Sequence, residues 1–193
     1  MNTVWTFGDS FTFGAECNSE IQYNQDSYYK KYYQESFDIW PNILGKMLGY
    51  KVKNLAVCGA SNEMIMETII DSFDYINKND IVFIQKTLGN FEELNILWSD
   101  ESNYKTNYRK FSSKLYKERN NKIFYFLKKQ LLNKTEDVYI WDTDDSFVKS
   151  IQTIRQHSNY IFKTSHFSFI GHNQFANYFY NNLFKKDEYK RTI

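Results

Sequence analysis

Residues 3–14 read TVWTFGDSFTFG, a short strand pattern that runs directly into a polar turn. The first five of these residues are β-branched or aromatic, which favours a β-strand, and Gly8 ends the run. Asp9 and Ser10 therefore follow the carboxyl end of a strand. In open α/β sheets this is the end at which ligands bind.

Strand and helix patterns alternate along the rest of the chain. Helices are predicted where apolar residues recur at helical spacing, at residues 39–48, 62–76, 104–132 and 172–184. Strands are predicted between them, at residues 52–57, 80–85 and 138–141. The apolar run Ile81–Ile84 is typical of a strand buried on both faces of a parallel sheet, and Asn120-Asn121 mark a candidate break in the third helix. The alternation predicts one domain over residues 1–193, with a flavodoxin-like three-layer α/β/α fold and a four- or five-stranded parallel sheet.

The composition is that of a globular domain and excludes several classes of protein. The 193 residues carry a net charge of only +1. Dedicated nucleic-acid binders typically carry a large positive charge, with a pI above about 9, so this class is not expected. No apolar run approaches the ~18 residues of a membrane-spanning helix. Cys17 and Cys58 are too few for a disulfide framework, and Cys58 is expected to be a small core residue. The first residues show no signal-peptide pattern, so we expect a cytoplasmic or virion-associated protein.

Aromatic residues are unusually frequent, at 19% of the chain. Tyr and Phe share AT-rich codons with Lys, Asn and Ile, so we attribute the excess to genome composition before function. Aromatic faces that stack on sugar rings are the alternative explanation. The Tyr-rich stretch at residues 23–33 is where such a groove wall would lie.

Polar and small residues follow each of the first three predicted strands and precede the last helix. The four segments are Gly8–Gly14, Cys58–Asn62, Thr87–Asn90 and Ser165–His172. Because parallel strands end at the same edge of a sheet, we expect a Ser, a Gly, an Asn and a His to meet there. The convergence of the four segments is more informative than any one of them.

This set of residues suits acyl transfer. The Ser10 hydroxyl is a weak nucleophile unless a base such as His166 takes its proton. The tetrahedral intermediate needs hydrogen-bond donors already in place, and the candidates are the Ser10 N–H, the Gly59 N–H and the Asn90 side-chain amide. The three histidines lack metal-ligand spacing, so no metal is expected.

The chain resembles the SGNH hydrolases, also called the GDSL esterase/lipase superfamily. The residues that carry the resemblance are Gly8-Asp9-Ser10 with Gly14, the segment Asn54–Ser61, and His166 with Gly171-His172. The resemblance implies that Ser10 is the nucleophile, that His166 is the base, and that Ser10, Gly59 and Asn90 form the oxyanion hole. It also implies an ester of a small acyl group as substrate, with an O-acetylated carbohydrate as the expected case, and no cofactor.

Two motifs depart from the family pattern. In the third block, Gly89 and Asn90 are adjacent and no Asp follows them. In the last block, Lys163 stands where the family has the Asp that orients the histidine. Either Ser10 and His166 act as a dyad, or a carbonyl or carboxylate from elsewhere orients His166. Asp142, Asp144 and Asp145 end a neighbouring strand and are the candidate carboxylates.

Two hypotheses for the function therefore stay open. The first is a serine esterase that acts on a small-molecule or carbohydrate ester. The second is a catalytically inactive binding or structural module of the same fold, for example in a phage particle or a glycan-associated system, and Lys163 motivates it. Neither hypothesis includes a nucleic-acid partner or a membrane span, and the sequence predicts no oligomeric state.

Overall fold

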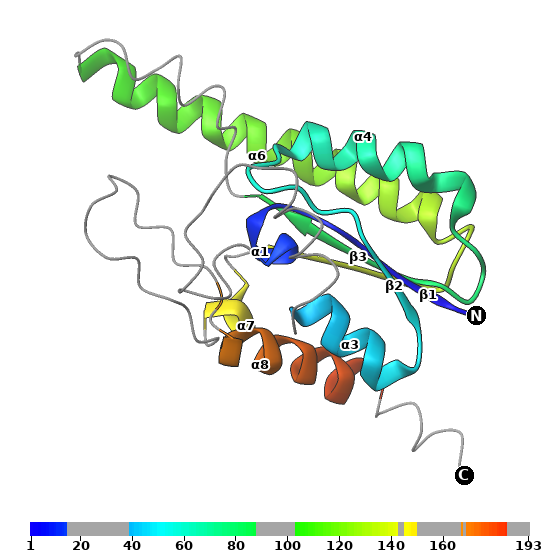
Figure 1. Cartoon of the computed structure of the whole chain (residues 1–193). Coiled ribbons are helices and arrows are strands. Elements are labelled where there is room, and N and C mark those ends of the chain that lie inside the picture. The colour runs from blue at the N-terminus through cyan, green and yellow to red at the C-terminus, as the bar shows by residue number, and fades with distance from the viewer. Residues whose placement is uncertain (15–38, 88–102, 143–144, 150–166, 168, 185–193) are drawn as a thin grey trace.

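A four-stranded parallel sheet forms the centre of the molecule (Figure 1). The computed structural model describes residues 1–14, 39–87, 103–142, 145–149, 167 and 169–184. The strands are β1 (Thr3–Phe7), β2 (Lys51–Asn54), β3 (Ile81–Lys86) and β4 (Asp137–Asp142). They pair in the order β2-β1-β3-β4, which is the beginning of the flavodoxin-like strand order. The fold class expected from the sequence is confirmed.

Helices cover both faces of the sheet. The α-helices are α1 (Ser10–Phe13), α3 (Trp40–Leu48), α4 (Asn62–Ser72), α6 (Asn103–Leu131), α7 (Ser146–Lys149) and α8 (Phe169–Phe179). A 3-10 turn, η1 (Phe73–Tyr75), follows α4, and a π-helical turn, η2 (Tyr180–Phe184), follows α8. Helices α4 and α6 lie on one face, whereas α3 and α8 lie on the other (Figure 1). Within the described ranges, no helix combines the length and apolar character that crossing a bilayer requires.

Successive residues of β3 serve two separate cores because side chains alternate across a strand. Ile81 and Phe83 face α3 and α8, in a layer dominated by aromatic rings. Trp40 of α3 lies at the centre of this layer, with its ring centroid 4.7 Å from that of Phe175. Full burial of side chains of this size contributes about 1.5–3 kcal/mol each.

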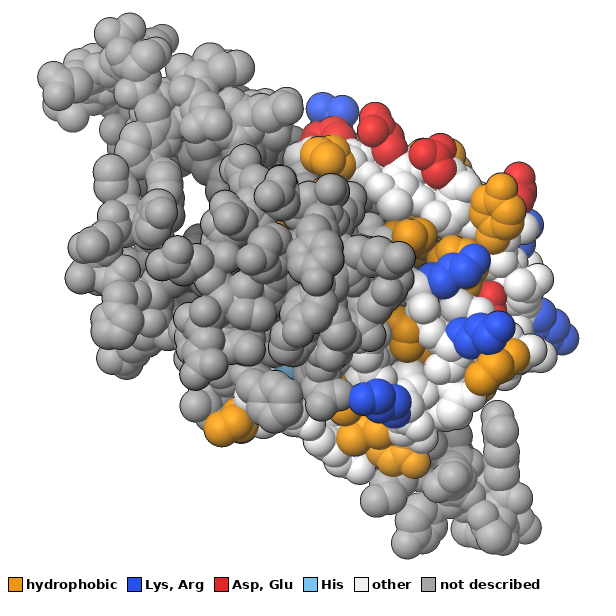
Figure 2. Space-filling model, viewed as in Figure 1, with side chains coloured by type: hydrophobic (Ala, Val, Ile, Leu, Met, Phe, Trp, Pro, Cys, Tyr) orange, Lys and Arg blue, Asp and Glu red, His pale blue; other side chains and the backbone are white. Residues whose placement is uncertain are grey.

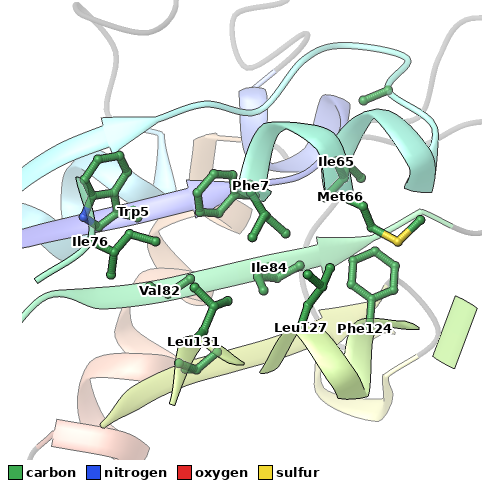
Figure 3. Close-up of a cluster of buried hydrophobic side chains, with 13 residues drawn as sticks. Trp5, Phe7, Ile65, Met66, Ile76, Val82, Ile84, Phe124, Leu127 and Leu131 are labelled. Carbon is green, nitrogen blue, oxygen red and sulfur yellow. The ribbon is translucent and has the colours of Figure 1, made fainter. Parts of the chain in front are cut away.

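The opposite core lies between the sheet and helices α4 and α6 (Figure 3). Val82 and Ile84 of β3 point into it, where they meet Ile65 and Ile69 of α4 and Phe124 of α6. The outer face of α4 carries the exposed Glu67 and Asp71 together with the exposed Met64 and Ile70, and Figure 2 shows acidic side chains gathered over this helix. The buried apolar stripe of the helix, which includes Ile65 and Ile69, is turned to the sheet.

Several predicted boundaries are confirmed by the local chemistry of the chain. Helix α3 carries Pro41 in its first turn, where the missing N–H removes no helical hydrogen bond, and ends at Gly49, whose φ of 69° is left-handed. Helix α4 begins after Ser61, whose side chain accepts a hydrogen bond from the Met64 N–H at 3.3 Å.

Other boundaries differ from the sequence-based expectation. Helix α6 runs through Asn120-Asn121 without a break, because the low helix propensity of asparagine costs well under about 1 kcal/mol per residue and the buried apolar face of the helix outweighs it. Strand β2 ends at Asn54, although the chain still follows β1 as far as Val57. The last helix begins at Phe169, three residues before the expected start at His172. Cys58 is half-buried and not a core residue.

Candidate active site

The site lies where the chain leaves neighbouring strands toward opposite faces of the sheet. β1 and β3 are adjacent in the sheet. The next described long helix after β1 is α3, which lies on one face of the sheet, whereas the next described long helix after β3 is α6, which lies on the other face (Figure 1). Such a switch point is the place where doubly wound sheets bind ligands, outside the carboxyl ends of the strands. Gly8–Ser10 and Thr87 follow the two strands at this edge, which we call the carboxyl edge.

Ser10 is the first residue of α1, directly after the end of β1. Asp9 is the N-cap of this short helix, and its carboxylate accepts a hydrogen bond from the Phe11 N–H at 3.0 Å. The Phe13 N–H donates to the Asp9 carbonyl at 2.9 Å, and Gly14 ends the helix with a left-handed φ of 87°. Ser10 itself is partly exposed between the buried residues Asp9 and Thr12. The turn therefore presents the Ser10 side chain on a fixed backbone.

A buried amide, that of Gln85, holds this turn from the side of β3. Its Oε1 accepts hydrogen bonds from the Asp9 N–H at 3.3 Å, the Thr12 N–H at 3.1 Å and the Thr12 hydroxyl at 2.6 Å. Its Nε2 donates to Asp9 Oδ1. A single side chain thus bonds the residue before Ser10 and the residue two positions after it.

Gly8 permits this close approach. A Cβ atom at position 8 would lie 2.7 Å from both Cβ and Oε1 of Gln85 and 2.8 Å from the Thr12 hydroxyl. These distances are shorter than van der Waals contact, so a larger residue would push the turn and β3 apart.

Asn54 secures the other side of the turn. Its Nδ2 donates to the Thr12 carbonyl at 3.0 Å, and its Oδ1 accepts from the Thr6 hydroxyl at 2.9 Å. The Val57 N–H donates to the Gly8 carbonyl at 3.0 Å, so the chain beyond β2 runs beside the start of the turn. The described backbone around Ser10 is bonded to both neighbouring segments.

Gly59 lies on this same edge, two residues after Val57. The Ala60 N–H donates to the Val57 carbonyl at 3.0 Å, and Gly59 has a φ of 76° at the third position of this turn, as a type II turn requires. Gly59 is exposed, and its own N–H forms no hydrogen bond with any described residue. This N–H can therefore donate a hydrogen bond to an anionic oxygen.

Asn62 connects the Gly59 turn to the end of β3. It is the first residue of α4, is 3% exposed, and forms two hydrogen bonds with the Thr87 backbone. Its Nδ2 donates to the Thr87 carbonyl at 3.0 Å, and its Oδ1 accepts from the Thr87 N–H at 2.9 Å. The chain that leads toward Asn90 therefore leaves the sheet from a fixed point.

Two of the candidate carboxylates, Asp142 at the end of β4 and Asp145 just after it, already have partners among the described residues. Asp142 pairs with Lys86, with 3.2 Å between Oδ2 and Nζ, and Lys86 also donates to Asn121 Oδ1 at 3.1 Å. The Asp142 N–H donates to Asp145 Oδ2 at 3.0 Å. Asp142 therefore lies at the carboxyl edge beside β3, and Asp145 bonds the backbone of Asp142.

His172 is buried on the face of the sheet that α3 and α8 cover. It is 1% exposed, and its Nδ1 accepts a hydrogen bond from the Trp40 N–H at 3.2 Å. This contact joins α8 to α3, so His172 has a structural role. Four other residues of interest lie outside the described residues, and these are Asn90, Asp144, Lys163 and His166.

The structure thus brings Ser10 and the Gly59 turn to one edge and adds residues that the sequence analysis did not identify. These are the three buried or half-buried side-chain amides of Asn54, Gln85 and Asn62. Only Gln85 had a visible signal, since it is a polar residue directly after the apolar run Ile81–Ile84. Asn54 and Asn62 stand at segment boundaries, where asparagine is common.

Comparison with protein-family models finds no match, and comparison with curated proteins finds none either. Among solved structures, the chain is similar to a member of the lipolytic protein G-D-S-L family from Veillonella parvula DSM 2008, with 14% identity, a TM-score of 0.48, and 96% of this chain and 100% of that chain covered. It is also similar to a protein from Desulfitobacterium hafniense DCB-2, described as lipolytic and of the G-D-S-L family, with 16% identity, a TM-score of 0.44, and 92% and 97% covered. Both carry the name of the family that the sequence motifs resemble.

Proposed function

We propose that this chain is a serine esterase of the SGNH hydrolase type, with Ser10 as its nucleophile. The observation that carries the proposal is the position of Ser10. It begins α1 at the switch point between β1 and β3, and the residues around it are held by the amides of Gln85 and Asn54. A serine fixed in this way at a ligand-binding edge is suited to nucleophilic attack.

The reaction runs in two steps. The Ser10 hydroxyl attacks the ester carbonyl, its proton passes to His166, and the carbonyl electron pair moves to the oxygen. Collapse of the tetrahedral intermediate expels the alcohol, which takes the proton from His166 and leaves an acyl-Ser10. Water then attacks the acyl group with His166 as base, which releases the acid and restores the Ser10 hydroxyl.

The oxyanion is stabilised by the Ser10 N–H, the Gly59 N–H and the Asn90 amide. Gly59 supports this assignment because the residue is exposed at the carboxyl edge and its N–H bonds no described residue. Loss of one such donor typically costs about 10²–10³-fold in turnover. A fixed backbone donor needs no reorganisation when the charge develops.

Because Lys163 stands in place of the family's Asp, either a carbonyl or a carboxylate from elsewhere orients His166, or Ser10 and His166 act as a dyad. We keep Asp142, Asp144 and Asp145 as candidates, with a Ser10–His166 dyad as the alternative. Asp142 already pairs with Lys86 and so would serve two partners. Asp145 already caps the turn after β4 through Oδ2.

The substrate class we propose is an ester of a small acyl group, with an O-acetylated carbohydrate as the first compound to test. The support for this class is the family resemblance of the motifs. The reaction as proposed uses no metal or organic cofactor.

The proposal is tested by p-nitrophenyl acetate hydrolysis with the native chain, Ser10→Ala and Ser72→Ala. Ser72 is the matched control, since it is a buried serine of α4 whose hydroxyl donates to the Thr68 carbonyl within the helix. We expect Ser10→Ala to fall to the uncatalysed rate and Ser72→Ala to keep the native rate. Equal rates for the native chain and Ser10→Ala would refute the proposal.

A further inference from the structure

We propose that Gln85 is a positioning residue for the nucleophile, and that its buried amide holds the Ser10 turn in the reactive conformation. The inference rests on the proposed function, because it assigns a role in the reaction of Ser10. It adds a residue outside the family motifs, on β3, whereas Ser10 follows β1.

The position of Gln85 is unusual for a polar side chain. It is fully buried in β3 and follows four buried apolar residues of the same strand. By protein mutational data, burial of an amide is unfavourable by about 1–3 kcal/mol unless its polar atoms are hydrogen-bonded. Every hydrogen bond of this amide to a described residue goes to Asp9 or Thr12. The side chain is therefore committed to the turn that carries Ser10.

An amide is the neutral group that meets the demands of this turn. Its oxygen receives three donors, while its nitrogen donates to the Asp9 carboxylate. An apolar side chain of the same size would leave the buried donors of Asp9 and Thr12 without this partner. A glutamate would place a second carboxylate against that of Asp9.

Few charged or titratable groups lie near Gln85 among the described residues. Asp9 is the titratable group that its amide contacts. Lys86 lies on the other face of β3 and pairs with Asp142. His172 of α8 is buried on the same face as Gln85, and its Nδ1 accepts from the Trp40 N–H. A charge introduced at position 85 will therefore act first on Asp9.

Such a residue affects turnover more than substrate binding. Misplacement of a reacting group by about 1 Å typically costs about 10²-fold in rate. Gln85 is fully buried, so we expect it to make no contact with the substrate and its loss to lower kcat while leaving KM nearly unchanged.

The decisive variant is Gln85→Glu, assayed with p-nitrophenyl acetate as a ratio to the native chain at each pH, so that the titration of His166 cancels. At low pH, the introduced carboxyl group and Asp9 share one proton, and the O–H of the new side chain replaces the lost N–H donor. As pH rises this shared proton leaves, two buried carboxylates repel, and the turn moves. We expect the kcat ratio to fall by about 10-fold or more between about pH 6 and about pH 9, with KM steady.

Two further variants separate positioning from stability. Gln85→Met is close in size and neutral, and we expect kcat to drop about 10²-fold with the ratio independent of pH. Asn120→Asp is the matched control, because Asn120 is 4% exposed in α6 and neither of its amide atoms bonds a described residue. It makes the same amide-to-carboxylate change away from the turn, so we expect lower stability and an unchanged kcat ratio.

The outcomes distinguish the two proposals. If Ser10→Ala is as active as the native chain, the proposed function fails and the role of Gln85 fails with it. If Ser10→Ala is inactive but the Gln85→Glu ratio is flat across pH, only the inference about Gln85 is overturned. If Gln85→Glu does not fold, Gln85→Met decides: a lower kcat at unchanged KM supports the inference, and a native kcat overturns it.

Discussion

Gly8 has room for a hydrogen atom and nothing larger on the side that faces β3. A Cβ there would lie 2.7 Å from the Gln85 side chain and 2.8 Å from the Thr12 hydroxyl. The added Cβ would have to displace the turn that positions Ser10, because the movement of a flexible side-chain end would not make enough room. The small size of this residue is therefore a condition for the geometry of the site.

Gly8→Ala is expected to lose activity out of proportion to stability. Overpacking of this kind costs about 1–3 kcal/mol, whereas a shift of the Ser10 turn costs about 10²-fold in kcat. Gly49→Ala is the control, since nothing lies within 4 Å of its Cβ position and its φ of 69° makes alanine unfavourable, by about 1–2 kcal/mol. Urea unfolding and p-nitrophenyl acetate assays of both variants provide the measurement. An equal loss of kcat in both variants would contradict the account.

At the level of single residues, the role of Asp9 has a local signal in the sequence, whereas the roles of the amides have none. Asp9 stands between a strand pattern and a serine, where an N-cap is the ordinary role of an aspartate. Gln85 bonds Thr12 across 73 positions of the chain, and no local pattern encodes a partner at that distance. The residues expected to supply the base and the third oxyanion donor, His166 and Asn90, lie outside the described residues, so their roles stay predictions.

At the level of elements, the start of α4 is joined to the end of β3 by one side chain. The Asn62 amide bonds both the N–H and the carbonyl of Thr87, at 2.9 and 3.0 Å. The same helix is capped independently by Ser61, which bonds the Met64 N–H. The two residues are neighbours, yet Asn62 is the one that links two segments of the carboxyl edge.

Asn62→Ala and Ser61→Ala are therefore expected to differ in their effect on catalysis. Loss of the cap at Ser61 costs about 1 kcal/mol of stability and leaves kcat nearly native. Loss of Asn62 leaves buried Thr87 groups unpaired, which costs about 2–4 kcal/mol, and lowers kcat by about 10-fold because Gly59 and the chain toward Asn90 lose their common support. Thermal unfolding and steady-state kinetics measure both effects. A native kcat for Asn62→Ala would show that the Thr87 contact serves stability alone.

The elements themselves were largely predictable because their periodic patterns are strong. The apolar run Ile81–Ile84 indicated a strand buried on both faces, and the structure confirms it. The boundaries failed where tertiary contacts override local preference, as at Asn120, which is buried in an unbroken α6. Where β2 ends is set by Asn54, whose contacts with Thr6 and Thr12 are not local.

At the level of the whole molecule, the sheet separates the candidate site from a stabilising contact at its opposite edge. Asp80 precedes β3 and is 3% exposed. Its carboxylate accepts hydrogen bonds from the Trp5 Nε1–H at 2.9 Å, the Thr3 N–H at 2.8 Å and the Asn77 N–H at 3.0 Å. These bonds join the starts of β1 and β3, a full strand length from Ser10.

Asp80→Ala is expected to lower stability without changing catalysis. Unpairing several buried donors costs about 3 kcal/mol, which corresponds to a Tm about 6–12 °C lower for a chain of this size. Asp74→Ala is the control, because that carboxylate is 93% exposed and 3.7 Å from Lys134 Nζ, so no measurable shift in Tm is expected. Calorimetry and kcat below the transition provide the test. A reduced kcat in folded Asp80→Ala would contradict the separation of site and anchor.

The layered architecture was predictable from the alternation of patterns alone, whereas the strand order came only with the flavodoxin-like expectation. Alternation predicts a parallel sheet with helices on both faces, but it does not say that β1 lies between β2 and β3. That order follows from which helix covers which face, a property of packing between distant segments. It is also what creates the switch point beside Ser10.

The central claim is that Ser10 is a reactive nucleophile, and covalent labelling tests it most directly. A fluorophosphonate reacts when an activated serine oxygen attacks phosphorus and fluoride leaves, which forms a stable adduct. After incubation of the folded chain with this probe, the peptides are analysed by mass spectrometry. The account predicts one adduct, on the peptide that contains Ser10, with loss of esterase activity in step with labelling and no adduct in Ser10→Ala. An esterase activity that survives full exposure with Ser10 unlabelled, or an adduct on another serine, would contradict it.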